Sequence, residues 1–399
     1  FSPQEKADFD VKMSGKLEGI GARLQSDGEK TTVTEIVPGG PAWKMNELEA
    51  KDIILKVAQG DAEAVDVMGL EIDDVVAKIR GPKGTTVKLT IQKPDGSVKV
   101  ISIVRDVVIT EEALAKSLLL DTKDNSDKVG YIYLPKFYAD FTAEGVTSCA
   151  DDVAKEVEKL KRENVKGIIL DLRNNGGGSL RDVVRMSGLF IEQGPIVQVK
   201  SRNRQPDINA DSDPRVQYGG PLIIMVNGFS ASASEILAAA MQDYGRAVIV
   251  GTSGTYGKGT VQRFWDLDMA SNDPTVKPLG EMKVTIQKFY RITGKTTQLD
   301  GVKPDIVLPD SYNYVDLGER ENDHPLDANT IAPVPFSQDA YQVANLGKLQ
   351  EKSASRVKVD PIMKKIEENA QRLRRQKDQS KYPLQLETYR AWDKKLEEE

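Results

Sequence analysis

The chain has 399 residues, of which 39% are hydrophobic and 29% charged, and its formal net charge is -6. This length is enough for two or three domains, each with its own core. The net charge is small against 55 basic and 61 acidic side chains, so nucleic acid is not expected as a partner. No apolar run approaches the ~20 residues that span a bilayer, so no integral membrane segment is expected. The single cysteine, Cys149, excludes disulfides within the chain and zinc sites built on paired cysteines.

Residues 15–107 are predicted to form a small β-rich domain. One helix is predicted over 70–81, because its apolar residues recur on one stripe and a glycine ends it. Pro and Gly at 93–97 supply a hairpin turn between the last two strands. Runs of β-branched residues predict the strands at 31–37, 53–57, 87–92 and 98–104.

From 108 to 345, long helices alternate with short apolar strands, which predicts an α/β core. The strands at 167–170, 222–226 and 247–250 are too continuously apolar to be half exposed, so their sheet is expected to be covered on both faces. The polar stretch 201–220 is predicted to be a surface excursion.

Residues 346–399 are predicted to be helical and highly charged. Asp360 fits an N-cap and Pro361 the first helical position. One face of this helix carries a narrow apolar stripe that requires a partner, such as the α/β core. The stripe consists of Ile362, Ile366, Ala370 and Leu373.

Three hydroxyls lie between a predicted buried strand and a helix, in the sequence NGFSASASEI at 227–236. Ser232 and Glu235 fit a capping box, in which the hydroxyl only satisfies a backbone N–H group at the start of the helix. The same position also favours a nucleophile, because free N–H groups and the helix dipole stabilise an oxyanion. The residues alone leave both interpretations open.

A lysine and a glycine run follow two other predicted strands. The loop TYGKGTVQ at 255–262 does not fit a phosphate-binding loop, since Thr252 and Gly259 replace residues that this motif requires. Lys258 is therefore either a solvated lysine or a base, and the amide oxygen of Gln262, four residues on, could hold its amine. In LDLRNNGGGSL at 170–180, the glycines form a flexible loop or let N–H groups converge on an anion. In the second case Gly177 or Gly178 is half of an oxyanion hole.

The single histidine restricts the mechanism. His324 lies in a polar, proline-containing loop with no apolar strand beside it, which disfavours a Ser-His-Asp hydrolase. If Ser232 is a nucleophile, its base should be a lysine whose ordinary pKa of ~10.4 is lowered by burial. Lys258 is the candidate.

Four motifs together resemble the C-terminal processing, or tail-specific, Ser/Lys proteases. They are NGFSASASEILAAAMQDYGRAVIVG, TYGKGTVQ, LDLRNNGGG and LEGIGA. The resemblance selects Ser232 among the three serines as the nucleophile, Lys258 as the base and Gln262 as the residue that positions it. It implies oxyanion donors at the N–H groups of Ala233 and of Gly177 or Gly178.

The resemblance also implies a domain arrangement: a PDZ domain inserted ahead of a mixed α/β protease core, with an incomplete C-terminal helical tail. Residues 1–14 would be the remnant of an N-terminal segment that packs on the core. The PDZ domain is residues 15–107, although a Gly-x-Gly loop alone would be an ordinary turn. The chain departs from the family at Lys51, where glycine often precedes the aspartate. The loop that captures a peptide carboxylate would be Gly19, Ile20, Gly21 and Ala22.

The expected function is that of a serine endopeptidase that recognises proteins by apolar, unstructured C-termini and needs no metal or organic cofactor. The resemblance implies a periplasmic location and allows for an adaptor protein. An alternative is a non-catalytic PDZ scaffold that binds tails without cutting them. A third interpretation, acyl transfer or ester hydrolysis on a non-peptide substrate, uses the same side chains.

Overall fold

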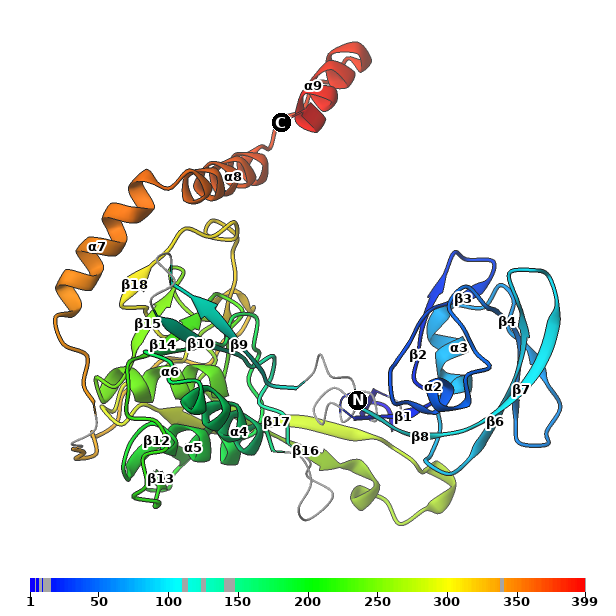
Figure 1. The fold of residues 1–399 in the computed structure, drawn as a ribbon, viewed down its shortest axis with the longest axis horizontal. Helices are drawn as coiled ribbons and strands as arrows, with labels where there is room; N and C mark the ends of the chain where they lie inside the picture. Colours follow the sequence, from blue (N-terminus) through cyan, green and yellow to red (C-terminus); the bar gives the residue numbers. More distant parts are fainter. Residues whose placement is uncertain are drawn as a thin grey trace. The chain divides into compact units, whose positions relative to one another are not determined.

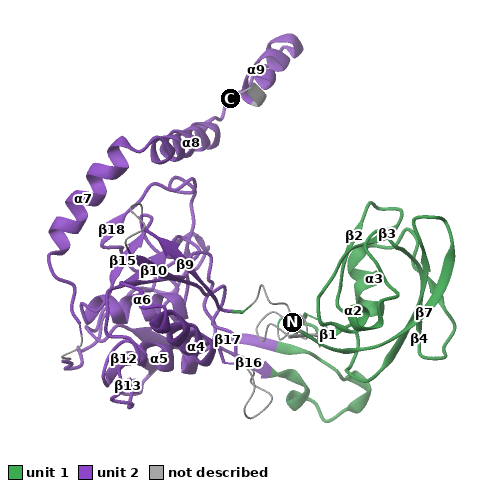
Figure 2. Ribbon diagram, in the orientation of Figure 1, with its two compact units in different colours: residues 1–114, 140–146, 266–281 green, residues 115–139, 147–265, 282–399 purple. Residues whose placement is uncertain are grey.

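The structure, a computed structural model, describes residues 1–3, 5–6, 9, 16–109, 114–122, 127–139, 148–337 and 341–398. The chain forms two compact units (Figures 1 and 2). Unit 1 contains the described residues of 1–114 and 266–281, and unit 2 those of 115–139, 147–265 and 282–399. The predicted multidomain α/β class is confirmed, whereas the expectation for residues 1–14 falls mostly outside the described residues.

Unit 1 is built on an antiparallel sheet with the strand order β2-β3-β4-β6-β7, to which β5 adds beside β4. Branched apolar side chains of the strands and of α3 fill its core, among them Val33, Ile54, Val75 and Leu89. The four predicted strands and the helix are all present. The elements are β1 (Lys16–Gly19), β2 (Ala22–Ser26), β3 (Thr31–Ile36), α2 (Pro41–Met45), β4 (Ile53–Gln59), β5 (Val65–Asp66), α3 (Ile72–Ile79), β6 (Thr86–Gln92), β7 (Val98–Val104) and β8 (Asp106–Ile109), which pairs with β1.

The turn before β4 explains how this chain tolerates a lysine in place of the expected glycine. Lys51 has φ +78°, in the left-handed region that favours glycine. Its N–H group donates to the carbonyl oxygen of Val33 at 2.7 Å. The next residue, Asp52, is buried and accepts from the Glu49 N–H group at 2.8 Å and from Lys93 Nζ at 3.0 Å. These bonds hold the turn and leave its backbone strained.

Lys51→Gly is therefore expected to raise the free energy of unfolding of unit 1 by about 0.5–1 kcal/mol, since it removes a left-handed non-glycine residue. Chemical denaturation of the full chain measures the change. Lys56→Gly is the matched control, because Lys56 lies inside β4, where glycine should lower stability. A Lys51→Gly variant no more stable than the parent would contradict the strain.

Unit 2 is centred on a six-stranded sheet with the order β18-β15-β14-β11-β10-β9. All neighbours are parallel except β9, which runs antiparallel to β10. Three neighbouring strands, β11, β14 and β15, are the three predicted from sequence, so the loops that follow them meet at one edge. The elements are β9 (Lys116–Asp121), β10 (Lys128–Tyr133), α4 (Cys149–Arg162), β11 (Ile168–Asp171), α5 (Leu180–Gly188), β14 (Leu222–Val226), α6 (Ala233–Asp243), β15 (Val248–Gly251) and β18 (Ile306–Val307).

The sheet is less covered than its sequence predicts. Leu222, Ile224 and Val226 of β14 are buried, whereas Ile223 and Met225, on the opposite face, are only half-buried. Helices α4, α5 and α6 lie together on one side of the sheet (Figure 1), so burial is complete on one face only.

A second sheet in unit 2 has the order β13-β12-β17-β16. The stretch 201–220 is not wholly an excursion, because β13 lies within it and pairs with β12. Its polar residues did not predict a strand, since a partly exposed edge strand needs few apolar side chains. The strands are β12 (Gly194–Ser201), β13 (Asp207–Asp211), β16 (Thr260–Asp266) and β17 (Glu281–Tyr290).

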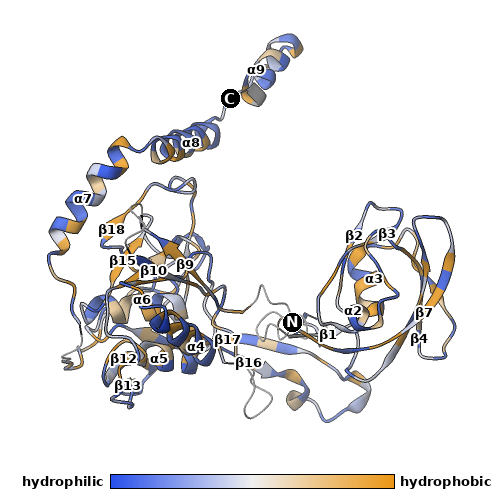
Figure 3. Ribbon diagram, viewed as in Figure 1, coloured by the Kyte–Doolittle hydropathy of each residue, from blue (hydrophilic) through white to orange (hydrophobic). Residues whose placement is uncertain are grey.

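The C-terminal region is helical, as predicted. Asp360 caps α8, accepting from the N–H groups of Ile362 at 2.8 Å and Met363 at 3.1 Å. The predicted apolar stripe is only partly covered, because Ala370 is buried and Ile362 is exposed. Figure 3 shows that hydrophobic and hydrophilic residues alternate along these helices. The helices are α7 (Leu346–Val359), α8 (Pro361–Asp378) and α9 (Leu386–Glu398). Short 3-10 turns occur earlier in the chain, at η2 (Leu267–Ala270), η3 (Pro274–Val276) and η4 (Glu319–Glu321). Within the described ranges, every helix is too short or too polar to cross a bilayer.

Candidate active site

The turn between β14 and α6 presents one of its three serines. Ser232 is half-buried and has φ 56° and ψ -112°, a strained conformation of the kind found where a nucleophile is held on a sharp strand-to-helix turn. The other two hydroxyls are buried and engaged. Ser230 Oγ donates to the carbonyl oxygen of Leu172 at 2.8 Å, and Ser234 Oγ to that of Asn175 at 2.8 Å. Ser230 and Ser234 thus tie the serine loop to the glycine loop, which leaves Ser232 for chemistry.

A single carboxylate joins the serine loop to the lysine loop. Glu235 is fully buried. One of its oxygens, Oε2, accepts from the N–H groups of both Ser232 (2.7 Å) and Lys258 (3.0 Å). The other, Oε1, accepts from Thr255 Oγ1 (2.6 Å) and the Gly257 N–H group (2.7 Å). The Glu235 half of the predicted capping box is formed, and it also brings the two candidate catalytic residues to one oxygen atom.

Burial raises the pKa of Glu235 to about 7, although the hydrogen bonds from Thr255 and the three N–H groups act in the opposite direction. The ionised form is the one that can accept all four bonds. The carboxylate therefore holds both loops most firmly at neutral and alkaline pH.

Lys258 meets the electrostatic requirement for a base. Burial lowers the pKa of its amine, the nearby charge of Lys283 lowers it further, and the charges of Glu319 and Glu235 act against this. Lys258 Nζ donates to Gln262 Oε1 at 3.0 Å. This contact was expected from the four-residue spacing and is formed, although Gln262 lies in strand β16 and not on a helical turn. The β-branched residues Thr260 and Val261 favour the strand.

The glycine loop packs directly on the serine turn. Gly177 has φ +92°, and a Cβ atom there would lie 2.6 Å from the Ala231 carbonyl oxygen and 2.9 Å from the Ala233 nitrogen. Only glycine leaves that space in front of the Ala233 N–H group. The Gly177 N–H group itself donates to Asn175 Oδ1 at 2.9 Å. In this arrangement Gly178 and Ala233 are the better pair of oxyanion donors, and that role stays a prediction.

An ion pair between buried Asp171 and exposed Arg173, beside the glycine loop, was not predicted. Asp171, at the end of β11, is buried and accepts from Tyr131 Oη at 2.6 Å and Arg173 Nη2 at 2.7 Å. These bonds fix the start of the glycine loop against β10. The only signal in the sequence was charged residues directly after an apolar strand, which also fits an exposed loop.

Unit 1 carries a separate groove beside its edge strand. The groove has a volume of about 550 Å³ and is lined by Gly19, Ile20, Gly21 and Ala22, by β2, and by Val76, Ile79 and Arg80 of α3 and its C-cap. β2 lies at the edge of its sheet, so an extended peptide could add to it as a further strand. The groove therefore brings together all four residues predicted to bind a peptide terminus.

The described part of the chain contains no cluster of three His, Cys, Asp or Glu side chains that could hold a metal ion. A serine hydroxyl, a buried lysine amine and backbone N–H groups are the groups that a hydrolase of the Ser/Lys class uses. Here they lie on an α/β core that follows a domain with a groove beside its edge strand.

Comparison with known proteins gives the family. Residues 128–308 match peptidase family S41, residues 8–92 the PDZ domain, and residues 312–399 the C-terminal domain of tail specific protease. The carboxyl-terminal-processing protease of a Picosynechococcus species is 32% identical over 79% of this chain and 70% of its own length. The chain belongs to the S41 family of C-terminal processing proteases, and the recognition from sequence motifs is confirmed. The PDZ domain precedes the core in this chain, so its expected insertion is wrong here.

Other relatives show how much of a family member the chain represents. The tail-specific protease of Haemophilus influenzae is 39% identical over 90% of this chain, and the chain spans 51% of the length of that relative. Among solved structures, the photosystem II D1 C-terminal processing protease is 25% identical, with a TM-score of 0.44 over 77% of this chain and 76% of that one. The PDZ domain of a Vibrio cholerae carboxy-terminal protease, in complex with peptide, is 43% identical, with a TM-score of 0.23 over 23% of this chain and 97% of that one.

Proposed function

We propose that this chain is a serine endopeptidase that holds a protein by its apolar, unstructured C-terminus and cuts it with Ser232 and Lys258. The observation that carries the proposal is the shared Glu235 oxygen, to which the N–H groups of both residues donate. Family membership and the lowered pKa of Lys258 support the same chemistry. No metal or organic cofactor takes part in the proposed steps.

The reaction has two half-steps. The neutral amine of Lys258 takes the proton of Ser232 Oγ as that oxygen attacks the peptide carbonyl carbon. N–H groups of Ala233 and Gly178 stabilise the oxyanion. When the C–N bond breaks, the ammonium of Lys258 protonates the leaving amine and an ester to Ser232 remains. Lys258 then deprotonates a water that attacks the ester, and the proton returns to Oγ.

Tail recognition belongs to the groove of unit 1. A C-terminal peptide would pair with the open edge of β2, its carboxylate held by backbone N–H groups of the loop Gly19–Ala22. Val76 and Ile79 of α3 line the same groove, which favours apolar side chains on the peptide. A separate adaptor protein and a periplasmic location are further parts of the proposal, drawn from the family resemblance, and osmotic-shock fractionation of producing cells would check the location.

The proposal is tested with an unfolded protein that ends either in an apolar tail or in the same tail with acidic residues. The parent is expected to cut only the apolar-tailed protein, and Ser232→Ala should still bind that tail, measured by fluorescence anisotropy, without cutting. Binding by the parent with neither cleavage nor labelling of Ser232 by an acylating probe would favour the scaffold. Equal cleavage of both tails would refute the role of the groove.

A further inference from the structure

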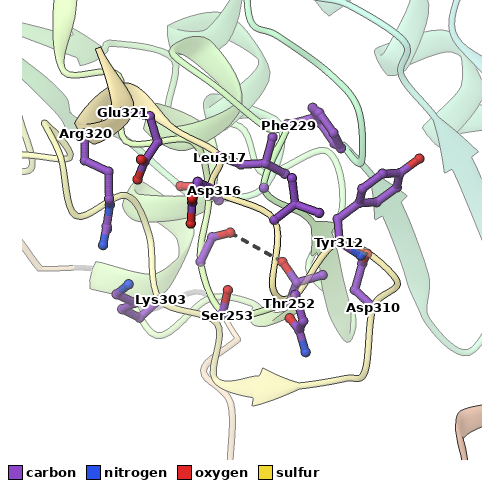
Figure 4. A pocket seen from close by; sticks show the side chains of 15 residues that line it. Phe229, Thr252, Ser253, Lys303, Asp310, Tyr312, Asp316, Leu317, Arg320 and Glu321 are labelled. Atoms are coloured by element: carbon purple, nitrogen blue, oxygen red, sulfur yellow. Dashed lines mark hydrogen bonds between the residues drawn. The ribbon is translucent and has the colours of Figure 1, made fainter. Parts of the chain in front are cut away.

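A segment that precedes the C-terminal helices covers the edge of the sheet where the serine loop and the lysine loop begin. Asp310–Arg320, called the strap below, lies over a cavity of about 270 Å³ (Figure 4). The serine loop lines the cavity with Gly228 and Phe229, and the lysine loop with Thr252–Thr255. The strap belongs almost entirely to the region matched beyond the peptidase core, which begins at residue 312.

The strap contacts the serine loop through apolar side chains. The ring of Tyr312 meets that of Phe229 edge to face, with centroids 5.3 Å apart and planes at 87°. Leu317 packs over Gly228, where an added Cβ would be 3.5 Å from Leu317 Cδ1. Both contacts fall within four residues of Ser232, so they hold the backbone that leads into the nucleophile.

The strap holds the lysine loop by its backbone. The Glu319 N–H group donates to the carbonyl oxygen of Tyr256 at 2.9 Å. Gly318 has φ +120°, and a Cβ atom there would lie 2.6 Å from that same oxygen, so the close approach requires glycine. Arg320 Nη2 donates to the Leu299 carbonyl oxygen at 2.8 Å, and the Leu299 N–H group donates to the Gly257 carbonyl oxygen at 2.8 Å. Tyr256 and Gly257, which these bonds hold, directly precede Lys258.

Glu319 also acts on the lysine by charge. Three charged groups act on the pKa of the Lys258 amine: Lys283 of β17, Glu235 of α6 and Glu319 of the strap. Lys283 lowers the pKa of Lys258, and the two carboxylates raise it. Among these groups, Glu319 is the one supplied by the C-terminal region.

Helix α8 anchors the outer side of the strap. Tyr314 Oη donates to Glu367 Oε1 at 2.9 Å, and the Arg374 guanidinium lies 5.1 Å from the centroid of the Tyr314 ring. Asp316 forms an ion pair with Lys377. A single residue, Asn313, separates Tyr312, which contacts the serine loop, from Tyr314, which contacts α8. The strap thus connects α8 to both catalytic loops.

We propose that the strap is a positioning element of the Ser232–Lys258 pair, that Glu319 is its positioning residue for Lys258, and that α8 holds the strap in place. This gives the C-terminal region a part in the reaction itself. The inference rests on the proposed peptidase function. One measurement distinguishes failure of the inference from failure of the proposed function: the rate at which a small serine-directed fluorophosphonate labels Ser232 in the full chain. Such a probe needs the activated hydroxyl and does not need the groove.

The first arm is the pH profile of labelling. Glu319→Gln keeps the backbone contact to Tyr256 and removes the charge, so the midpoint of the rising limb is expected to move to lower pH. Glu321→Gln is the matched control, since Glu321 is exposed and is not among the charges that shift the pKa of Lys258. A Glu319→Gln profile that coincides with the parent's, or an equal shift in both variants, would overturn the role of Glu319. An unlabelled parent would instead refute the peptidase.

The second arm tests position. Tyr312→Ala is expected to lower the plateau rate roughly tenfold or more, because the serine loop loses its packing partner, while Tyr312→Phe keeps the ring contact and the parent rate. Combining Tyr314→Phe with Lys377→Met detaches α8 and should lower the plateau in the same direction. Thermal unfolding confirms that each variant is folded at the assay temperature. A folded Tyr312→Ala variant that keeps the parent rate would refute the positioning role of the strap. An unchanged rate in the double variant would refute the role of α8.

Discussion

Lys258→Met is expected to abolish measurable peptide hydrolysis and at the same time to stabilise the protein at neutral pH. The kinetic loss should reach roughly 10⁴-fold in kcat, the upper end for a general acid–base residue, because one amine serves both half-steps. Methionine keeps the length and apolar stem of the side chain. The loss therefore reports the amine and not the packing.

The stability gain follows from the direction of the pKa change. Burial lowers the pKa of Lys258 from its ordinary 10.5, so the folded state binds fewer protons than the unfolded state in the window below that value. The buried charge costs stability in full below the folded pKa, and the cost disappears as the pH rises toward 10.5. Lys258→Met should thus gain most at neutral pH and gain nothing at strongly alkaline pH.

Chemical denaturation of Ser232→Ala and of the double variant with Lys258→Met, measured at pH 7 and pH 10, checks this without self-digestion. Lys166→Met is the matched control, since Lys166 is exposed and its amine lies 3.9 Å from the Asp127 carboxylate. A Lys258→Met variant that retains hydrolysis would reject the lysine as base. A stability gain independent of pH would reject the buried charge as its cause.

The sequence located the site because strands and the loops after them leave a local signal. The apolar runs predicted at 167–170, 222–226 and 247–250 correspond to β11, β14 and β15, which are neighbouring parallel strands. The loops that follow them therefore meet at one edge of the sheet. Choosing Ser232 over Ser230 and Ser234 needed the structure or a family pattern. The hydroxyls of those two serines are bound to the carbonyl oxygens of Leu172 and Asn175, which are distant in sequence, and no local pattern shows these bonds.

What the sequence missed depends on tertiary contacts. Glu235 was visible only as a cap, although the same carboxylate accepts from three groups of a loop 20 to 23 residues further along the chain. Gln262 fitted a helical spacing that also fits a strand with a long side chain reaching back. The donor to Asn175 Oδ1 is Gly177, and no spacing rule shows that its N–H group is already used. A strained Lys51 was foreseen only as a departure from a pattern.

Glu235→Gln is expected to slow labelling of Ser232 and peptide hydrolysis roughly 10²-fold, with the affinity for a tail peptide unchanged. An amide has one oxygen where the carboxylate uses two. If its nitrogen takes the place of Oε2, it faces the N–H groups of Ser232 and Lys258, both donors. If it takes the place of Oε1, it faces the Gly257 N–H group. Each orientation leaves a buried donor unpaired, at about 1–3 kcal/mol.

The pH dependence separates this effect from a general loss of stability. With its pKa raised to about 7, Glu235 binds a proton in the folded state between about 4.5 and 7, so its contribution to stability falls as the pH rises through this window. Activity should rise through the same window, because only the ionised group accepts from all four donors. A neutral carboxyl places an O–H donor among N–H donors. Stability and activity are thus expected to change in opposite directions.

In Glu235→Gln, the rise of activity with pH that comes from ionisation of Glu235 should vanish from the pH–activity profile. The rise that comes from deprotonation of Lys258 should remain. Asp305→Asn is the matched control: Asp305 accepts from the Ile249 N–H group at 2.8 Å and from Gln242 Nε2 at 2.9 Å, a purely structural use in the same unit. It should lower the melting temperature and leave the labelling rate of the folded protein unchanged. If both variants lose rate in proportion to lost stability, Glu235 is a core residue only. If Glu235→Gln alone loses rate in folded protein, its carboxylate sets the geometry of the catalytic pair.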